Sequence, residues 1–578
     1  MTAFLSANLA PIMFAAMVVF MLIGFPVAFA LAACGLMFGM IGIELGLLSA
    51  SLFHAIPDRL FGLMMNDTLL AIPFFTFMGL ILERSGMAED LLDTVGQLFG
   101  SVRGGLAYAV IIVGAMLAAT TGVVAASVIS MGLISMPIML RYGYDRRLAC
   151  GVIAASGTLA QIIPPSLVLI VLADSLGKSV GDMYRGAFIP GFVLTALYAL
   201  YVFGLTVLRP SAAPGVPPEA RTLVGPKGAT GLPSLIALGV LFLVVAIGTG
   251  QGLPEEMPGD ESVVMMMSAG GVVVFALTVL NRMFGLTVLS KVAEKTVFAL
   301  VPPLALIFLV LGSIFVGLAT PTEGGAMGAT GAVLLALVKR RLSVSLLRQA
   351  MGVTARLTAF VLFIVVGARL FSLTFYGVDG HLWVEHLFAS LPGGQIGFLI
   401  VVNILIFLLA FFLDFFELAF IVVPLLAPVA DKLGIDLIWL GVLLSVNMQT
   451  SFMHPPFGAA LFFLRSVAPK EEYTDVVTGK RMAGITWGQI YLGSIPFVVI
   501  QLIMVALVIV YPNLVTMGLG KQAQADAAQI EKSLKDLDSP DQGSGERGDD
   551  TADPLKGLSG PSEAPDTTVD PLKGLNKD

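Results

Sequence analysis

Apolar runs of about 17 to 25 residues recur along most of this 578-residue chain. Each is long enough to cross a hydrocarbon layer of about 30 Å as a helix. The chain is 57% hydrophobic and only 12% charged, so a water-soluble fold would expose too much apolar surface. Lipid offers no water to backbone groups, and continuous rather than alternating runs favour helices over a barrel. The sequence therefore predicts an all-α polytopic membrane protein.

The apolar runs divide the chain into candidate membrane spans, several of them too long or too broken to be one simple helix. We place them at residues 9–24, 26–48, 68–83, 105–140, 148–173, 187–208, 231–250, 263–281, 297–318, 324–338, 354–375, 396–430, 437–464 and 488–511. The run 231–281 has the pattern of a helical hairpin with an acidic connection and basic outer flanks. By the positive-inside rule, its flanks are cytoplasmic and its connection faces outward.

An internal repeat relates the two halves of the chain. Arg103–Gly105 matches Pro392–Gly394, and each follows a Leu-Phe pair by a few residues. At one constant offset, the residues Pro137, Gly143, Asp145, Pro164 and Pro165 correspond to Pro428, Gly434, Asp436, Pro455 and Pro456. Random apolar sequence would not place Gly, Asp and Pro-Pro in register, so we expect two structural repeats.

The repeat defines four regions of the chain. They are an N-terminal membrane repeat (1–208), an inserted two-helix hairpin (209–296), a C-terminal membrane repeat (297–518) and an acidic tail (519–578). The tail is rich in Asp, Ser, Gly, Pro and Lys, so it is predicted to be disordered. In it the motif DPLKGL occurs twice, as a duplicated linker or a short docking peptide.

Several chemistries lack their sequence signatures. There is no P-loop, HExxH, GxSxG or Cys/His metal spacing, so we expect no enzyme activity and no cofactor. No basic patch with interleaved aromatic residues occurs, which argues against a nucleic-acid partner. Cys34 and Cys150 lie in apolar stretches and are interpreted as small buried hydrophobes. Nucleotide hydrolysis by this chain is therefore unsupported, and any energy that it uses should come from an ion gradient.

A polar cluster precedes Pro-Pro inside two apolar stretches, Gly157–Ser166 and Asn447–Gly458. Proline removes a backbone donor and disfavours helix at the residue before it, so each stretch should bend into a loop or re-entrant tip. Such a tip frees carbonyl and hydroxyl groups for a cation and directs helix N-termini at an anion. The alternative is a simple proline kink that neighbouring helices satisfy.

Two further motifs place polar groups between apolar runs. In Ala319–Gly325, Thr320, Thr322 and Glu323 surround another proline, and the alternative is a cytoplasmic or interfacial turn. Asp414 and Glu417 share one helical face between Phe-rich runs. Buried ionisable groups are costly in lipid, so this pair is a candidate for ion coordination or gating, or else marks an interface.

Single residues near these breaks are candidates for substrate binding. His454 stands directly before the second Pro-Pro, where it could sense protons, bind substrate or serve in capping and packing. Arg465, just beyond the second tip, could meet a carboxylate or extend to the membrane surface. The full set of candidate substrate ligands is Thr120, Thr121, Ser166, Glu323, Ser451, His454 and Arg465.

The motifs SGTLAQIIPPS, ATPTEGGAMGA, LDFFE and QTSFMHPPFG followed by SVAP resemble the large membrane subunit of the TRAP family, the tripartite ATP-independent periplasmic transporters. The resemblance covers roughly residues 10–208 and 297–511. It implies an elevator-type fold of two inverted repeats with re-entrant hairpins, in a multi-pass protein of the bacterial inner membrane. It also implies sodium-coupled import, a small four-helix membrane subunit and a periplasmic binding protein that delivers a small substrate, commonly a carboxylate.

On this resemblance we expect sodium at both hairpin tips, held mainly by backbone carbonyls and hydroxyls. The candidate ion ligands are Ser156, Gly157, Thr158, Thr320, Thr322, Asp414, Asn447, Gln449 and Thr450. The sequence departs from the usual family pattern in three places. These are the inserted hairpin with the acidic tail, the segment TTGVVAAS in place of a Ser-rich one, and His454 where Thr or Ser is more usual.

Two other functions are compatible with a polytopic chain. A stand-alone ion-coupled anion symporter would need no binding protein. A membrane-embedded enzyme would need acid, base or nucleophilic residues clustered on one cavity wall, whereas this sequence offers scattered Thr, Ser and single carboxylates.

Overall fold

The structure, a computed structural model, describes residues 2–517 except 101, 218–231, 255–256, 258, 286–287, 390 and 476, and beyond them residue 519. The chain divides into two units, Met1–Leu519 and Gly520–Asp578. The second unit lies outside the described residues, and so do the predicted disorder of the tail and its two DPLKGL copies.

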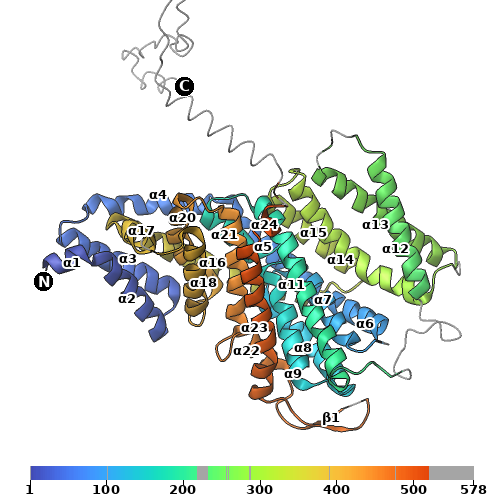
Figure 1. Cartoon of the computed structure of the whole chain (residues 1–578). Helices are drawn as coiled ribbons and strands as arrows, with labels where there is room; N and C mark the ends of the chain where they lie inside the picture. Colours follow the sequence, from blue (N-terminus) through green and yellow to red (C-terminus); the bar gives the residue numbers. More distant parts are fainter. Residues whose placement is uncertain are drawn as a thin grey trace, which may run out of the picture. The chain divides into compact units, whose positions relative to one another are not determined.

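The first unit is built from helices (Figure 1). Its N-terminal half contains α1 (Thr2–Ala7), α2 (Leu9–Ile23), α3 (Val27–Glu44), η1 (Ala50–Ala55), α4 (Ile56–Met64), α5 (Asp67–Arg84), α6 (Met87–Phe99), α7 (Gly105–Thr121), α8 (Val124–Arg141), α9 (Arg146–Thr158), η2 (Leu159–Gln161), α10 (Leu167–Leu176), α11 (Val180–Leu208) and η3 (Pro210–Ala212). The insertion contains α12 (Leu232–Gln251) and α13 (Gly259–Met283).

The C-terminal half continues with helices and one small ribbon of two strands. It contains α14 (Lys291–Phe315), α15 (Pro321–Val338), α16 (Val344–Gly377), α17 (Gly380–Ala389), α18 (Gly394–Leu409), α19 (Phe415–Glu417), the π-helical turn η6 (Leu418–Val422), α20 (Val423–Lys432), α21 (Leu437–Gln449), η7 (Thr450–Phe452), α22 (Ala459–Val467), β1 (Tyr473–Thr474), β2 (Arg481–Met482), α23 (Trp487–Val510) and α24 (Asn513–Thr516).

Among the described residues, eight helices are long and apolar enough to cross a membrane, or nine if the bent pair ending in α5 counts as one span. The all-α membrane fold is thus confirmed. The long predicted runs are interrupted: residues 105–140 form α7 and α8, and residues 396–430 form α18, α19, η6 and α20. Both Pro-Pro runs are interrupted in the same way, because α9 and α21 end before their prolines.

The two halves share local structure at equivalent positions. Gly104 and Gly393 precede α7 and α18 with positive φ angles of 76° and 96°, a conformation that favours glycine. Asp145 and Asp436 cap the N-termini of α9 and α21, accepting hydrogen bonds from Arg147 N and Trp439 N at 2.7 and 2.8 Å. The Pro-Pro peptide bond is cis in both halves. The inverted relation and the elevator motion stay predictions.

The insertion forms a helical hairpin that packs beside α14 (Figure 1). The two helices approach closely at Gly270, where an added Cβ would lie 2.9 Å from the carbonyl oxygen of Phe242. The insertion and the start of α14 share a small hydrophobic cluster, separate from the main core, made of Leu238, Val274, Leu289, Ala293 and Val297. Of the acidic connection, Glu255, Glu256 and the side chain of Asp260 lie outside the described residues.

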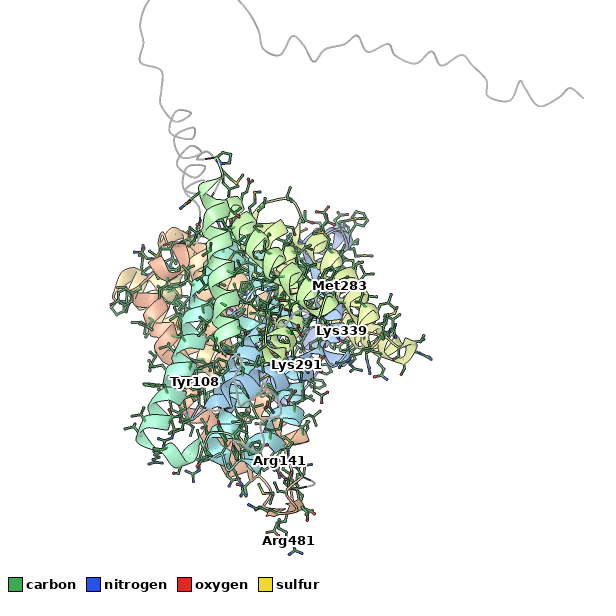
Figure 2. All side chains as sticks on the ribbon, turned by 90° about the vertical axis from the view of Figure 1, so that its right-hand side faces the viewer. Tyr108, Arg141, Met283, Lys291, Lys339 and Arg481 are labelled. Carbon is green, nitrogen blue, oxygen red and sulfur yellow. The ribbon has the colours of Figure 1, made fainter. Side chains whose placement is uncertain are left out.

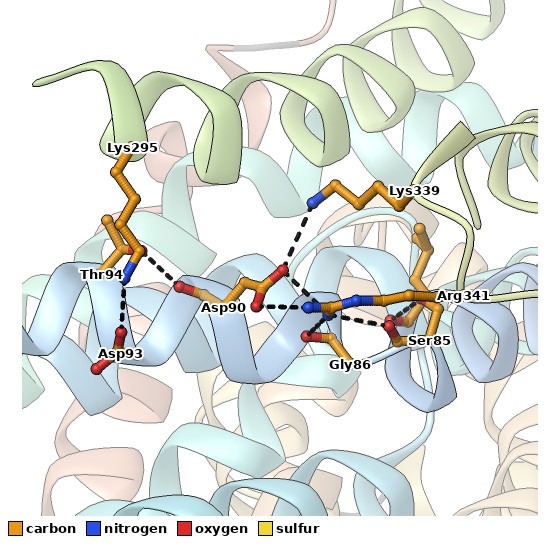
Figure 3. Close-up of polar contacts among 9 residues, drawn as sticks. Ser85, Gly86, Asp90, Asp93, Thr94, Lys295, Lys339 and Arg341 are labelled. Carbon is orange, nitrogen blue, oxygen red and sulfur yellow. Dashed lines mark hydrogen bonds and ion pairs between the residues drawn. The ribbon is translucent and has the colours of Figure 1, made fainter. Parts of the chain in front are cut away.

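Ion pairs connect α6 to the segments on either side of α15 (Figure 3). Asp90 lies 3.0 Å from the Arg341 guanidinium and 3.8 Å from Lys339 Nζ, and Asp93 lies 3.0 Å from Lys295 Nζ. These groups are partly exposed, so each pair contributes at most about 1 kcal/mol.

The β1–β2 ribbon is anchored to the end of α8. Arg141 makes a bidentate contact with Asp475, with nitrogen to oxygen distances of 2.9 and 3.1 Å. Figure 2 shows Arg141 and Arg481 of β2 toward the same end of the unit. The Arg141 guanidinium, together with Thr478, holds the pKa of the Asp475 carboxyl well below its ordinary value.

Candidate functional site

The two Pro-Pro segments, residues 156–166 (the first tip) and 447–458 (the second tip), have the same construction. In each, an α-helix passes into a 3₁₀ turn, η2 or η7, and the chain then leaves the helical conformation until α10 or α22 begins. Polar side chains from both tips are fully buried, including Ser156, Thr158, Gln449 and Thr450. Buried polar groups in a membrane protein need partners or ligands, so these segments are the leading candidate site.

Close backbone packing places the first tip against α23. A Cβ on Gly151 of α9 would lie 2.1 Å from the carbonyl oxygen of Gly493, and a Cβ on Gly493 would lie 2.1 Å from that of Arg147. Small residues allow helix backbones to approach in this way. Gly493 meets the start of α9, and Gln501 reaches Thr158 at the end of α9, so the two helices run in the same direction.

The tips contact each other directly. Gln449 Nε2 of the second tip donates to Thr158 Oγ1 of the first at 3.1 Å. Ser445 Oγ of α21 donates to the backbone oxygen of Gln161 at 3.0 Å, and Ser166 Oγ donates to the same oxygen at 2.6 Å. The polar groups of the two halves therefore form one continuous buried region.

Three tip hydroxyls donate their protons to carbonyls of their own helical turn. Thr158 donates to Ala155 O at 2.8 Å, Thr450 to Asn447 O at 2.7 Å and Ser451 to Met448 O at 2.6 Å. With the proton fixed in this way, each hydroxyl oxygen presents only lone pairs to its surroundings. Such oxygens suit a cation or an N–H donor.

Four buried tip oxygens have no hydrogen-bond partner within the described part of the chain: Ser156 Oγ, Gln161 Oε1, Asn447 Oδ1 and Gln449 Oε1. The Asn447 side chain is held in place, because its Nδ2 donates to the backbone and side-chain oxygens of Asn403 at 2.7 and 2.9 Å. An unsatisfied buried acceptor costs about 1–3 kcal/mol. These oxygens are therefore available to a cation or to water.

Gly157 has a packing reason to be glycine. A Cβ there would lie 2.4 Å from a methyl carbon of Val128 and 3.0 Å from the backbone nitrogen of Val128 in α8. Ser156 packs equally closely against α7, because a Cβ on Gly114 of that helix would lie 2.5 Å from Ser156 Cβ. The first tip is thus held by α7, α8 and α23.

His454 is buried in the second tip between two aromatic rings. It stacks on Phe411 with ring centroids 3.9 Å apart and meets Phe407 edge-on at 5.3 Å. Both ring nitrogens lack a hydrogen-bond partner among the described residues. The rings fix its orientation, and the nitrogens remain free for a ligand.

Arg465, Asp414 and Glu417 each make contacts within the C-terminal half of the chain. The Arg465 guanidinium donates to the backbone oxygen of Ile485 and lies 5.5 Å from the centre of the Trp487 ring. Asp414 caps α19, and the Glu417 side chain accepts a hydrogen bond from Asp414 N at 3.0 Å. Asp414 and Glu417 therefore lie at the break between α18 and α19, whereas Arg465 lies in α22.

Thr320, Thr322 and Glu323 lie at the start of α15. Thr320 and Glu323 form a capping box, in which Glu323 Oε2 accepts from Thr320 N at 2.8 Å. Thr322 Oγ1 donates to the backbone oxygen of Asp67 in α5. Thr320 and Glu323 are exposed, an arrangement that fits the alternative interpretation of an interfacial turn. Their predicted binding roles stay predictions.

Thr120 and Thr121 end α7, and their side chains lie outside the described residues. The break that follows them is set by Gly122, whose φ of +58° favours glycine.

A cavity of about 370 Å³ lies between α6, α7 and α8, and no tip residue lines it. The two charged residues in its lining, Asp93 and Arg141, are paired with Lys295 and Asp475. The described residues contain no group of three or more His, Cys, Asp or Glu that could hold a metal ion. Oxygen ligands at the tips thus remain the leading candidates for a cation.

Sequence reasoning missed four residues outside the tips whose side chains contact them: Tyr198 of α11, Asn403 of α18, Ser445 of α21 and Gln501 of α23. Each is polar within an apolar run, and this signal alone could have identified them.

The model of the family described as "Tripartite ATP-independent periplasmic transporter, DctM component" matches residues 14–514. The C4-dicarboxylate TRAP transporter large permease of Pseudomonas aeruginosa is 27% identical, over 81% of this chain and 89% of that protein. The 2,3-diketo-L-gulonate TRAP transporter large permease of Escherichia coli is 24% identical, over 79% and 89%. The sialic acid TRAP transporter permease of Haemophilus influenzae is 22% identical, over 86% and 66%.

Proposed function

As a member of the DctM component family of tripartite ATP-independent periplasmic transporters, this chain is a multi-pass large permease subunit of the inner membrane, and we propose that it imports a small organic acid driven by a sodium gradient. The observation that carries the proposal is the pair of buried, oxygen-rich tips that meet at Thr158 and Gln449. Family membership implies further subunits and a substrate-binding protein.

The substrate class is supported by chemistry at the second tip. C4-dicarboxylates, sialic acid and 2,3-diketo-L-gulonate, which appear in the names of three relatives, all carry a carboxylate. In this chain α22 begins after Gly458 without a side-chain cap, and Leu461 N donates to Gly458 O, so the N–H groups of Ala459 and Ala460 are the ones available to an anion. His454, four residues before Gly458, adds ring nitrogens without partners among the described residues. A carboxylate is the ligand that this combination suits.

Sodium is proposed as the transported coupling ion. It prefers oxygen ligands, and the tips offer buried oxygens from Ser156, Asn447 and Gln449 that lack partners within the described residues. Backbone carbonyls at the ends of α9 and α21 are further donors. Because these oxygens come from both tips, the sodium concentration would determine how often the ion is bound between them.

The proposed partners are a small four-helix membrane subunit and a periplasmic protein that delivers the acid. The test is uptake into proteoliposomes that contain this chain and the small subunit, with binding proteins loaded with dicarboxylic or sugar acids, with and without an inward sodium gradient. We expect uptake to require both sodium and a binding protein. Uptake without a binding protein would instead identify a stand-alone symporter, and uptake indifferent to sodium would exclude the proposed coupling.

A matched pair of variants links the uptake to the tips. Ser156→Ala removes a buried tip hydroxyl without a described partner, and Ser135→Ala removes another buried hydroxyl without a described partner, from α8 outside the tips. We expect a higher half-saturating sodium concentration only for Ser156→Ala. An equal effect of both variants would assign the change to general packing.

A further inference from the structure

Four fully buried polar side chains form one cluster where the two tips contact the neighbouring helices: Thr158, Tyr198, Gln449 and Gln501. They come from α9, α11, α21 and α23, and the last three of these helices run side by side (Figure 1). Gln501 Nε2 donates to Tyr198 OH at 2.9 Å, and Gln449 Nε2 lies 3.4 Å from the same oxygen. Both amides also approach Thr158 Oγ1, at 3.1 Å for Gln449 and 3.5 Å for Gln501.

The four side chains form a closed set of contacts. Thr158 Oγ1 and Tyr198 OH each lie within hydrogen-bond distance of both amides, those of Gln449 and Gln501. The proton of Thr158 is committed to Ala155 O, so the Thr158 oxygen acts only as an acceptor. Two members, Thr158 and Gln449, belong to the tips. The other two, Tyr198 and Gln501, lie on long helices outside them.

The helices that carry Tyr198 and Gln501 hold these side chains in fixed positions. Phe497 of α23 packs edge-on against the Tyr198 ring, with centroids 5.2 Å apart. The backbone contact between Gly151 and Gly493 fixes α23 against α9. The Tyr198 hydroxyl and the Gln501 amide are therefore placed by close packing of their helices, and both contact the tip residues Thr158 and Gln449 from there, Gln501 through Thr158 and Tyr198 through Gln449.

We propose that Tyr198 and Gln501 are positioning residues that hold the two tips in register, so that the tip oxygens present one geometry to the coupling ion. The inference rests on the proposed function, in which the tips bind sodium. Loss of either contact would leave the tips folded but less well ordered. Sodium would then bind more weakly, because part of its binding free energy would be spent on ordering the tips.

Tyr198→Phe and Gln501→Met test this inference, since each removes hydrogen-bonding atoms with little change in volume. Tyr184→Phe is the matched control, because Tyr184 lies on the same helix and is equally buried, and its hydroxyl has no partner among the described residues. We expect Tyr198→Phe and Gln501→Met to raise the half-saturating sodium concentration about threefold to tenfold, the loss expected for one hydrogen bond. The KM for the acid at saturating sodium should stay within about twofold of wild type.

The double variant should be no worse than about the larger single effect, because both residues act through one set of contacts. Size-exclusion profiles of each purified variant establish that it is folded. An unchanged half-saturating sodium concentration in both variants, or an equal rise in Tyr184→Phe, would overturn the positioning role. If wild-type uptake ignores sodium, the proposed function fails first, and the two failures are therefore distinguishable.

Discussion

Thr158 and Gln449 occupy equivalent positions in the two halves of the chain and hydrogen-bond to each other, with Gln449 Nε2 3.1 Å from Thr158 Oγ1. Each is the last residue of its helix, α9 or α21, at the point where the chain turns toward Pro-Pro. The two halves thus meet through corresponding residues. A substitution in one tip should therefore alter the hydrogen bonding of the other.

Substitution of Thr158 by Val and of Gln449 by Met should show coupled effects. Each change removes the same hydrogen bond, so the double variant should be less destabilised than the sum of the single ones by about 1 kcal/mol. Denaturant titration of the purified protein in detergent measures the free energies of unfolding. Strict additivity would show that the contact contributes nothing in solution.

Gly151→Val and Gly493→Val should prevent folding or strongly destabilise the protein. The first added carbon would lie 2.1 Å from a backbone oxygen, so α9 and α23 would have to separate. Overpacking of this kind typically costs about 1–3 kcal/mol, and rigid backbone on both sides places these sites at the upper end. Gly204→Val on α11, where a Cβ meets nothing within 4 Å, is the control, and yield and melting temperature are the measurements. Normal melting of Gly151→Val would contradict the close approach.

His454→Phe should fold normally and raise the KM for the organic acid. The phenyl ring retains the stacking on Phe411 but removes the two ring nitrogens. A hydrogen bond to a charged group contributes about 1.5–3 kcal/mol, so KM should rise about tenfold to a hundredfold. The half-saturating sodium concentration serves as the internal control and should not change. A wild-type KM in this variant would leave His454 with a packing role alone.

The ion pair of Arg141 with Asp475 should stabilise the protein at neutral pH and lose its effect in acid. Arg141 and Thr478 hold the pKa of Asp475 below its unfolded value, which is about 4. A lowered folded-state pKa stabilises above the unfolded pKa, and this stabilisation falls as the pH drops toward the folded value. Asp475→Asn should therefore melt below wild type at pH 7, with a difference that narrows below about pH 4. A difference that is constant with pH would show that the carboxylate charge is not involved.

Much of the fold could be predicted because hydrophobic length is a local signal. The predicted span 68–83 became α5 (Asp67–Arg84), and 488–511 became α23 (Trp487–Val510). Helices α6 and α17 were missed, because 13 and 10 residues are too short to cross a membrane and both carry charged side chains. Their helical structure depends on packing against other elements, which no window of sequence displays.

The tips could be located from the sequence because a polar cluster precedes each Pro-Pro, and proline removes a backbone donor and disfavours helix at the residue before it. Pro-Pro alone would not have been enough, since the pair Pro302–Pro303 lies inside the continuous helix α14. The partners of the tips could not be located, since Tyr198 and Gln501 reach them only through the close packing of α9, α11 and α23. The capping box of Thr320 and Glu323 was not predicted from the sequence, which offered these residues only as candidate ligands or as part of an interfacial turn.

The contact between Gly151 and Gly493 has a practical consequence for following the protein at work. The backbones of α9 and α23 are in direct contact at these two glycines, so we expect any displacement of one helix to move the other. Tyr511 directly follows α23, and 58% of its surface is exposed. A fluorophore attached at this position would report displacement of the first tip without touching it, so single-molecule recordings could be made on an otherwise unaltered site.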